Sequence, residues 1–155
     1  MVLVPQSVSY LDPLMKVGEQ VRRGQKDRES VMRCRQSMGR YGLGEDTEEL
    51  YPFELSGGMT RRVLISTAVM EHPRLVIADE PTPGLHISAA RRVLSHFREI
   101  ADQGAGVLLI THDLELALEV ADRIVVFYAG TNVEESLAAD FEDEQRLRHP
   151  YTRAL

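Results

Sequence analysis

The sequence is poor in cysteine and in basic charge, and it has no long apolar run. Its 155 residues contain one cysteine, Cys34, which excludes an internal disulfide and a cysteine-rich zinc site. Lysines and arginines number 18 against 24 aspartates and glutamates, so the net charge of −6 argues against nucleic acid as a partner. Apolar stretches such as residues 107–110 are far shorter than the ~20 residues of a membrane-spanning helix. We also expect no secretory signal at residues 1–6, which lack a basic segment.

What the sequence does have, from residue 56 onward, is an alternation of helical and strand patterns. Continuous apolar strands that alternate with helices predict an α/β fold, in which helices cover both faces of a mostly parallel sheet. In such sheets, functional groups gather at the carboxyl ends of the strands. The predicted helices are 57–71, 87–103 and 114–121, and the predicted strands are 2–4, 75–78, 106–110 and 123–127.

Two further segments have clear patterns. Residues 28–41 predict an amphipathic helix, and Cys34 falls on its apolar side, so we expect a buried thiol rather than a reactive one. Residues 129–131 predict a turn. The acidic segment after it predicts a helical tail with a solvated charged face. Its acidic residues are Glu134, Glu135, Asp140, Glu142, Asp143 and Glu144.

A glycine-rich helix start at residues 55–59 is the first candidate site. Ser56 can cap the helix, and Gly57 and Gly58 allow a ligand to approach the backbone. Free N–H groups at a helix start favour an anion such as phosphate. Arg61 and Arg62 follow, where the helix dipole disfavours cations unless an anion lies nearby. The alternative is a capped helix without a ligand.

Two acidic residues and a histidine follow the predicted strands. Asp79 and Glu80 end the strand 75–78, where two adjacent carboxylates are unfavourable without a metal ion or hydrogen bonds. Magnesium held by Asp79 and a water oriented by Glu80 would explain both residues. His112 follows the strand 106–110 and could contact a phosphoryl group. Helix capping by the acids and a structural hydrogen bond of the histidine are the alternatives.

In their order along the chain, these segments resemble the motifs of the ATP-binding cassette (ABC) ATPases. Leu55-Ser-Gly-Gly-Met59 looks like the signature motif, and Leu75-Val-Ile-Ala-Asp-Glu-Pro81 looks like Walker B. Ile110-Thr-His-Asp113 looks like the switch-histidine motif, and Gln6 stands where the Q-loop glutamine is expected. The resemblance covers nearly the whole chain and implies an incomplete P-loop NTPase fold with an inserted helical subdomain.

The resemblance implies a role for each residue that matches a motif. Asp79 and Gln6 would hold Mg²⁺ together with ATP. Glu80 would polarise the attacking water, and His112 would contact the γ-phosphate, which makes Glu80 and His112 the expected catalytic residues.

The signature residues would act on a second ABC ATPase subunit in a head-to-tail dimer. Ser56, Gly57, Gly58 and Met59 would cap the γ-phosphate of ATP bound to that subunit. Met59 replaces the usual glutamine of the motif. His86 replaces the aspartate that normally bridges the two cassettes.

The resemblance also implies a domain organisation and partners. We expect a Q-loop strand and start at 1–8, a helical subdomain at 9–55 that docks on transmembrane permease subunits, a catalytic core at 56–135 and a tail at 136–155. Residues 6–13 and 148–155 resemble the peptide and nickel importer branch. Such a subunit would be cytoplasmic, peripheral on the inner face of the cell membrane, and served indirectly by an extracytoplasmic solute-binding protein.

The Walker A motif of the family has no counterpart in the sequence. A P-loop needs a lysine directly after glycine. The two lysines, Lys16 and Lys26, follow Met15 and Gln25. We therefore expect that the first third of a cassette is missing, that ATP binding is weak and that the chain alone is inactive. Unpaired apolar strand edges are expected for the same reason.

Other interpretations remain open at this point. The chain could be a non-catalytic regulatory or assembly module that pairs with a complete cassette or with a separate P-loop half. Non-transport ABC proteins of repair or translation are a second possibility within the family. A third is a metal-dependent hydrolase whose candidate ligands are His72, Asp79, Glu80, His86 and His112.

Overall fold

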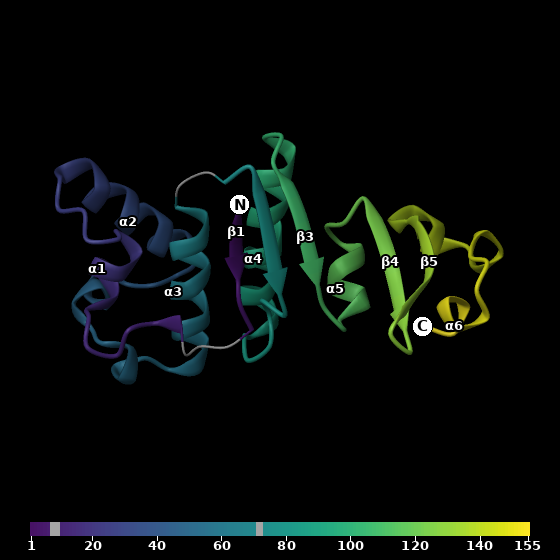
Figure 1. Ribbon diagram of the computed structural model, residues 1–155, viewed down its shortest axis with the longest axis horizontal. Coiled ribbons are helices and arrows are strands. Elements are labelled where there is room, and N and C mark those ends of the chain that lie inside the picture. The colour runs from purple at the N-terminus through teal and green to yellow at the C-terminus, as the bar shows by residue number, and fades with distance from the viewer. Residues whose placement is uncertain (7–9, 71–72) are drawn as a thin grey trace. The chain divides into compact units, whose positions relative to one another are not determined.

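The computed structural model describes residues 1–6, 10–70 and 73–155 of the chain (Figure 1). The chain divides into two compact units, residues 1–110 and residues 111–155. Within the described residues, no helix is both long enough and apolar enough to cross a membrane.

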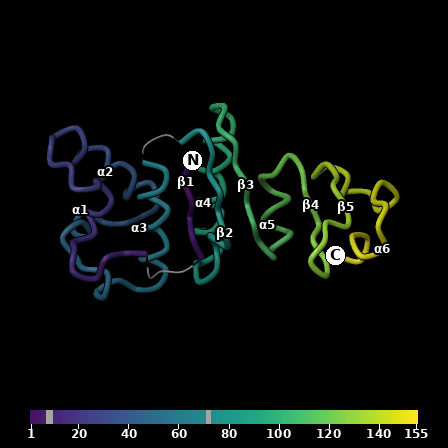
Figure 2. Tube along the Cα trace, viewed as in Figure 1, coloured from purple at the N-terminus to yellow at the C-terminus, as the bar shows by residue number. Residues whose placement is uncertain are grey.

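A parallel sheet forms the centre of the first unit. Among the described residues, its strands are β1 (Val2–Val4), β2 (Leu75–Asp79) and β3 (Gly106–Ile110), in that order (Figure 2). The predicted strands 2–4, 75–78 and 106–110 are therefore confirmed. Leu3, Ile77 and Leu108 lie opposite one another across the strands. Because the strands are parallel, their carboxyl ends meet at one edge.

The two faces of this sheet differ in burial. Val4, Val76 and Ala78 are fully buried on one face. The helix α3 (Gly57–Val69) contacts β1, and α4 (Ile87–Asp102) contacts β3 with apolar residues spaced three or four apart. The other face carries Leu3 and Leu108.

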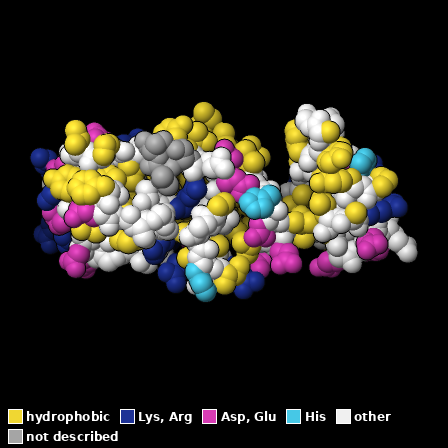
Figure 3. All heavy atoms as spheres, turned by 90° about the horizontal axis from the view of Figure 1, so that it is seen from below, with side chains coloured by type: hydrophobic (Ala, Val, Ile, Leu, Met, Phe, Trp, Pro, Cys, Tyr) yellow, Lys and Arg dark blue, Asp and Glu magenta, His cyan; other side chains and the backbone are white. Residues whose placement is uncertain are grey.

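That second face is open. Leu3 is 53% exposed, Leu108 52% and Ile110 47%. Hydrophobic side chains stand among charged ones at the protein surface in Figure 3. Parallel sheets are normally covered on both faces. Within the described residues of the first unit, the expected cover is therefore present on one face only.

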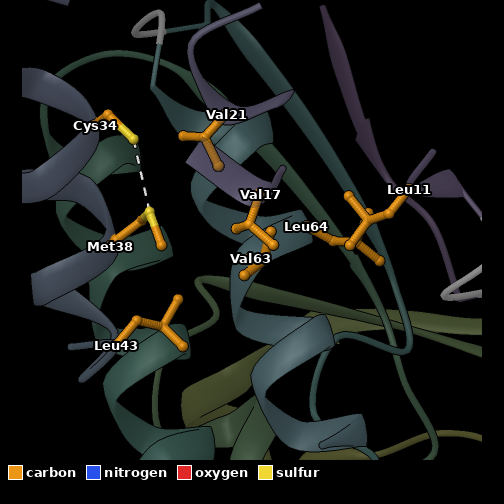
Figure 4. Close-up of a cluster of buried hydrophobic side chains, with 8 residues drawn as sticks. All are labelled: Leu11, Val17, Val21, Cys34, Met38, Leu43, Val63 and Leu64. Atoms are coloured by element: carbon orange, nitrogen blue, oxygen red, sulfur yellow. Dashed lines mark hydrogen bonds between the residues drawn. The ribbon is translucent and has the colours of Figure 1, made fainter. Parts of the chain in front are cut away.

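A helical region precedes and includes α3. The helices α1 (Val17–Val21), α2 (Arg28–Arg40) and α3 surround a hydrophobic core (Figure 4), and the short 3-10 helices η2 (Glu45–Glu49) and η3 (Pro52–Glu54) connect α2 to α3. Asp27 caps α2 by accepting a hydrogen bond from the Ser30 amide. The core consists of Leu11, Val17, Val21, Cys34, Met38, Leu43, Val63 and Leu64.

Cys34 is buried within this core, as predicted. Its Sγ lies 3.6 Å from the Sδ of Met38 (Figure 4). Burial raises the pKa of the Cys34 thiol to about 11. The thiolate is therefore scarce at neutral pH, and Cys34 acts as a small hydrophobic residue.

A partly buried ion-pair cluster fixes η2 to the helices. Glu48 is only 6% exposed and binds two arginines. Its Oε2 lies 2.6 Å from Nη1 of Arg22, and its Oε1 lies 2.7 Å from Nε of Arg35. One carboxylate thus connects α1, α2 and η2.

The second unit contains a hairpin whose second strand lies where a helical tail was predicted. After α5 (Leu114–Leu118), β4 (Arg123–Tyr128) pairs antiparallel with β5 (Thr131–Leu137). The predicted turn is present, since Ala129 and Gly130 have φ of 49° and 79°. Two successive positive φ values are typical of a hairpin turn. The prediction of a helical acidic tail is wrong for residues 131–137, and β4 pairs with β5 rather than with the parallel sheet.

Glu135, Glu142, Asp143 and Glu144 are exposed, as predicted for a solvated face, but Glu134 is buried. It is 8% exposed on β5. Its two carboxylate oxygens accept hydrogen bonds from the amides of Arg148, at 2.7 Å, and His149, at 2.9 Å. These bonds lower its pKa. Buried backbone amides replace water around this charge.

The remaining tail is short and packed locally. It contains the 3-10 helices η4 (Ala138–Glu142) and η5 (Glu144–Arg146) and the helix α6 (Pro150–Arg153). His149 caps α6 by accepting from the Tyr151 amide at 3.2 Å. The rings of Tyr128 and Tyr151 have centroids 4.3 Å apart. The tail is thereby attached to β4 and β5.

Candidate functional site

The carboxyl edge of the β1–β2–β3 sheet carries three of the predicted site residues. Asp79 is the last residue of β2, and Glu80 follows it. Gln6 is exposed two residues beyond the end of β1, the neighbouring strand. Parallel pairing of β1 with β2 places these strand ends at the same edge. The structure thus brings Gln6, Asp79 and Glu80 to one side of the sheet.

Glu80 adopts an unusual backbone conformation. Its φ is 46°, in the left-handed region that non-glycine residues rarely occupy. Its amide donates to the Ile110 carbonyl at 2.9 Å, which extends the pairing of β2 with β3. Such a conformation is unfavourable by about 1–3 kcal/mol, and residues of this kind cluster at functional sites.

The predicted cap at the start of α3 is confirmed. The Oγ of Ser56 accepts a hydrogen bond from the Met59 amide at 3.3 Å, and Ser56 and Gly57 are exposed. A Cβ added to Gly58 would lie 3.4 Å from the Gly84 carbonyl oxygen. The helix start therefore lies within van der Waals contact of the loop that follows β2.

Met59 and His86 make local contacts. Met59 is partly buried and packs on the helical core. His86 caps α4, with its Nδ1 accepting from the Ser88 amide at 3.4 Å and lying 3.0 Å from the Ser88 hydroxyl. These contacts hold the two side chains in place, and their roles toward a nucleotide stay predictions.

Arg61 connects α3 to the edge of the sheet. It is 7% exposed, and its Nη1 donates to the Pro5 carbonyl at 3.0 Å. Desolvation lowers the pKa of Arg61, and the negative charges of Glu80 and Asp79 oppose this shift. The anionic neighbours expected for this cation are present. The sequence signal was its place near the helix start, where a cation needs such a partner.

His112 belongs to the second unit, two residues beyond the end of β3. Its part in the site stays a prediction. His72 lies outside the described residues.

The donor atoms at the sheet edge fit magnesium bound with a nucleotide. Within the described residues, no group of three or more His, Cys, Asp and Glu side chains is placed to hold a metal ion. A zinc-type hydrolase site needs three protein ligands, so the described part of the chain does not support that alternative. Mg²⁺ commonly takes one or two carboxylates plus phosphate oxygens. Asp79 supplies such a carboxylate.

Comparison with known proteins gives the family. The family profile described as ABC transporter matches residues 1–83. The oligopeptide transport ATP-binding protein OppD of Lactococcus lactis subsp. cremoris is 38% identical over 96% of this chain and 46% of its own length. The dipeptide transport ATP-binding protein DppD of Haemophilus influenzae is 44% identical over 72% of this chain and 33% of its own length. The chain thus spans about half the length, or less, of these relatives.

Solved structures agree. An ATP-binding cassette dimer in a post-hydrolysis state, bound to ADP and Pi, superposes with a TM-score of 0.79 at 26% identity, over 88% of this chain and 62% of that one. An ATP binding subunit of an ABC transporter gives a TM-score of 0.81 at 28% identity, over 95% and 62%. The predicted fold is therefore confirmed. With its cassette fold and its family profile over residues 1–83, the chain belongs to the ABC transporter family.

Proposed function

We propose that the chain is part of the ATP-binding subunit of an ABC importer that takes up peptides. The observation that carries this proposal is the placement of Gln6, Asp79 and Glu80 at one edge of a cassette sheet. The relatives named above are oligopeptide and dipeptide transport proteins, which favours peptides as cargo. Nickel or other metal chelates, predicted from the tail segment, remain the alternative cargo.

At the sheet edge, Asp79 and Gln6 would hold Mg²⁺ that arrives with ATP. Bound there, Mg²⁺ neutralises charge on the phosphate oxygens. Glu80 would orient the attacking water and accept its proton. His112 would contact the terminal phosphate.

The start of α3 would serve a second ABC ATPase subunit. Ser56 and Gly57 are exposed, and the first amides of a 13-residue helix favour an anion. Together with Gly58 and Met59, they would cap the γ-phosphate of ATP held by that subunit. His86, in the loop and cap beside Gly58, would lie at the same dimer surface.

Residues 9–55 would dock on the transmembrane permease. Exposed large hydrophobic side chains support this role: Tyr10 is 67% exposed, Leu14 87% and Phe53 75%. Such exposed side chains are typical of protein contacts. A solute-binding protein would act only through the permease, and the subunit would sit on the inner face of the membrane.

The chain alone is expected to be inactive, because neither of its lysines follows a glycine. The purified chain should release no phosphate from ATP in the presence of magnesium. Adding a polypeptide that contains the P-loop half of an OppD-type cassette should produce turnover, and Glu80→Gln should abolish it. Turnover by the chain alone that Glu80→Gln removes would contradict the expected inactivity.

A regulatory or assembly module is the second candidate function. The observation that favours it is the closed core of the helical region, which would present a folded docking surface without ATP. A pull-down with a complete OppD-type cassette tests it, with Phe53→Ser as a surface variant. Absence of binding at micromolar concentration would reject this candidate.

A further inference from the structure

We propose that Arg61 is a positioning residue that holds the Gln6 end of β1 against α3 and supplies the counter-charge for Asp79 and Glu80. The proposal rests on the proposed function only for the roles given to Gln6, Asp79 and Glu80. Its measurements below use no ATP hydrolysis, so the two can fail separately.

The first support is the contact with Pro5. The Nη1 of Arg61 lies 3.0 Å from the Pro5 carbonyl oxygen, 56 residues away in sequence. Pro5 directly precedes Gln6, and Arg61 lies five residues after Ser56 on α3. One side chain therefore connects the helix of the signature segment to the segment that carries Gln6.

The second support is the electrostatics of burial. Arg61 is 7% exposed as a residue, and loss of hydration from a charged side chain is unfavourable unless anions compensate. Val4 pairs with Ala78, so the Pro5 carbonyl that Arg61 contacts lies at the strand end that carries Asp79 and Glu80. The negative charges of these two residues favour the charged form of Arg61. The neighbouring Arg62 faces a different environment, because its Nη1 donates to the carbonyls of Tyr41, at 3.0 Å, and Gly42, at 3.1 Å.

The counter-charge has a consequence for magnesium. A fixed positive charge repels a divalent cation from bare carboxylates. Asp79 would then hold Mg²⁺ weakly without a nucleotide, and more strongly once phosphate oxygens bring additional negative charge. Arg61 thus makes the capture of magnesium at the sheet edge depend on the nucleotide.

Binding of Mn²⁺ alone, followed by electron paramagnetic resonance, tests the counter-charge. We expect Arg61→Gln to bind Mn²⁺ about three- to tenfold more tightly than the unaltered chain. The double variant Arg61→Gln, Asp79→Asn should no longer show this increase in Mn²⁺ affinity. Arg62→Gln is the matched control, because it removes the same charge from the next position on the helix and should leave the affinity unchanged.

Amide hydrogen exchange tests the positioning role. Arg61→Lys keeps the charge but loses the planar fork that reaches the Pro5 carbonyl. It should keep the weak Mn²⁺ affinity while the Gln6 amide exchanges several-fold faster. Equal Mn²⁺ affinity in the unaltered chain and Arg61→Gln, or no bound Mn²⁺ in either, would overturn the counter-charge. Unchanged exchange at Gln6 in both variants would overturn the positioning role.

Discussion

The helical region and the parallel sheet belong to one compact unit, yet their apolar side chains are buried to different extents. Val17, Cys34 and Val63 are fully buried among α1, α2 and α3, so the helical core is closed on all sides. The sheet is buried on the face of Val76 and Ala78, while Leu3 and Leu108 on its other face are half exposed. The stability of the helices therefore comes from contacts within the chain, whereas the sheet leaves part of its apolar surface in water.

The largest difference should appear when one side chain is truncated in each region. Met38 is 1% exposed, so Met38→Ala should lower the free energy of unfolding by about 2–5 kcal/mol. Leu108 is 52% exposed, so Leu108→Ala should lower the free energy of unfolding by less than about 1 kcal/mol. Urea unfolding measures both values, and labelling of Cys34 reports whether the helical core has opened. Equal losses would show that the two regions are not distinct in this sense.

A smaller effect is expected at the ion-pair cluster of the helical region. Glu48→Gln leaves Arg22, which is 15% exposed, without its carboxylate. Breaking such a pair should lower the free energy of unfolding by about 2–3 kcal/mol. Glu49→Gln, next in sequence, removes an exposed pair with Lys16 and should have no measurable effect. Thermal unfolding of both variants measures the difference. Equal effects would mean that the buried pair stabilises the helical region no more than the exposed pair does.

At the sheet edge, relief of the backbone strain at position 80 should raise the free energy of unfolding by about 1 kcal/mol. Glycine accepts the φ of 46° at position 80 without a penalty, while alanine does not. Glu80→Gly should therefore be more stable than Glu80→Ala in denaturant unfolding, although glycine normally destabilises. The reverse order would mean that position 80 is not strained.

The smallest change in stability is expected from a charge placed on the open face. Leu108→Lys should alter the free energy of unfolding by less than about 1 kcal/mol, because the side chain already faces water. It should also reduce binding of a hydrophobic dye such as ANS and lower aggregation. Met32→Lys, at a position 63% exposed on α2, is a control outside the sheet. A large loss of stability in Leu108→Lys would show that this face is closed in solution.

Much of the fold could be predicted, because its main signals are local. The apolar strands, the Ser56 cap and the spacing of α4 depend on neighbouring residues in the sequence. The strand β4 and its turn were predicted, but β5 was missed because its acidic residues suggested a solvated helix and because Glu134 is satisfied by amides 14 and 15 residues away. No local sequence pattern predicts a hydrogen-bond partner so far along the chain.

The same limit applies to the candidate site. Asp79 and Glu80 were found because acids at the end of an apolar strand stand out in a sequence. The contact of Arg61 with Pro5 spans 56 residues, and it depends on the register of β1 against β2. The packing of Met59 on the helical core likewise depends on the folded chain, whereas the contact of His86 with Ser88 spans only two residues.

Because the Glu134 carboxylate accepts hydrogen bonds from the amides of Arg148 and His149, the last residues of the chain should move together with the hairpin. A fluorophore attached at Arg153 would therefore tumble at the rate of β4 and β5 rather than with the fast local motion of a loose terminus. Such a probe would report on the motion of this unit while leaving the sheet edge of Gln6, Asp79 and Glu80 untouched.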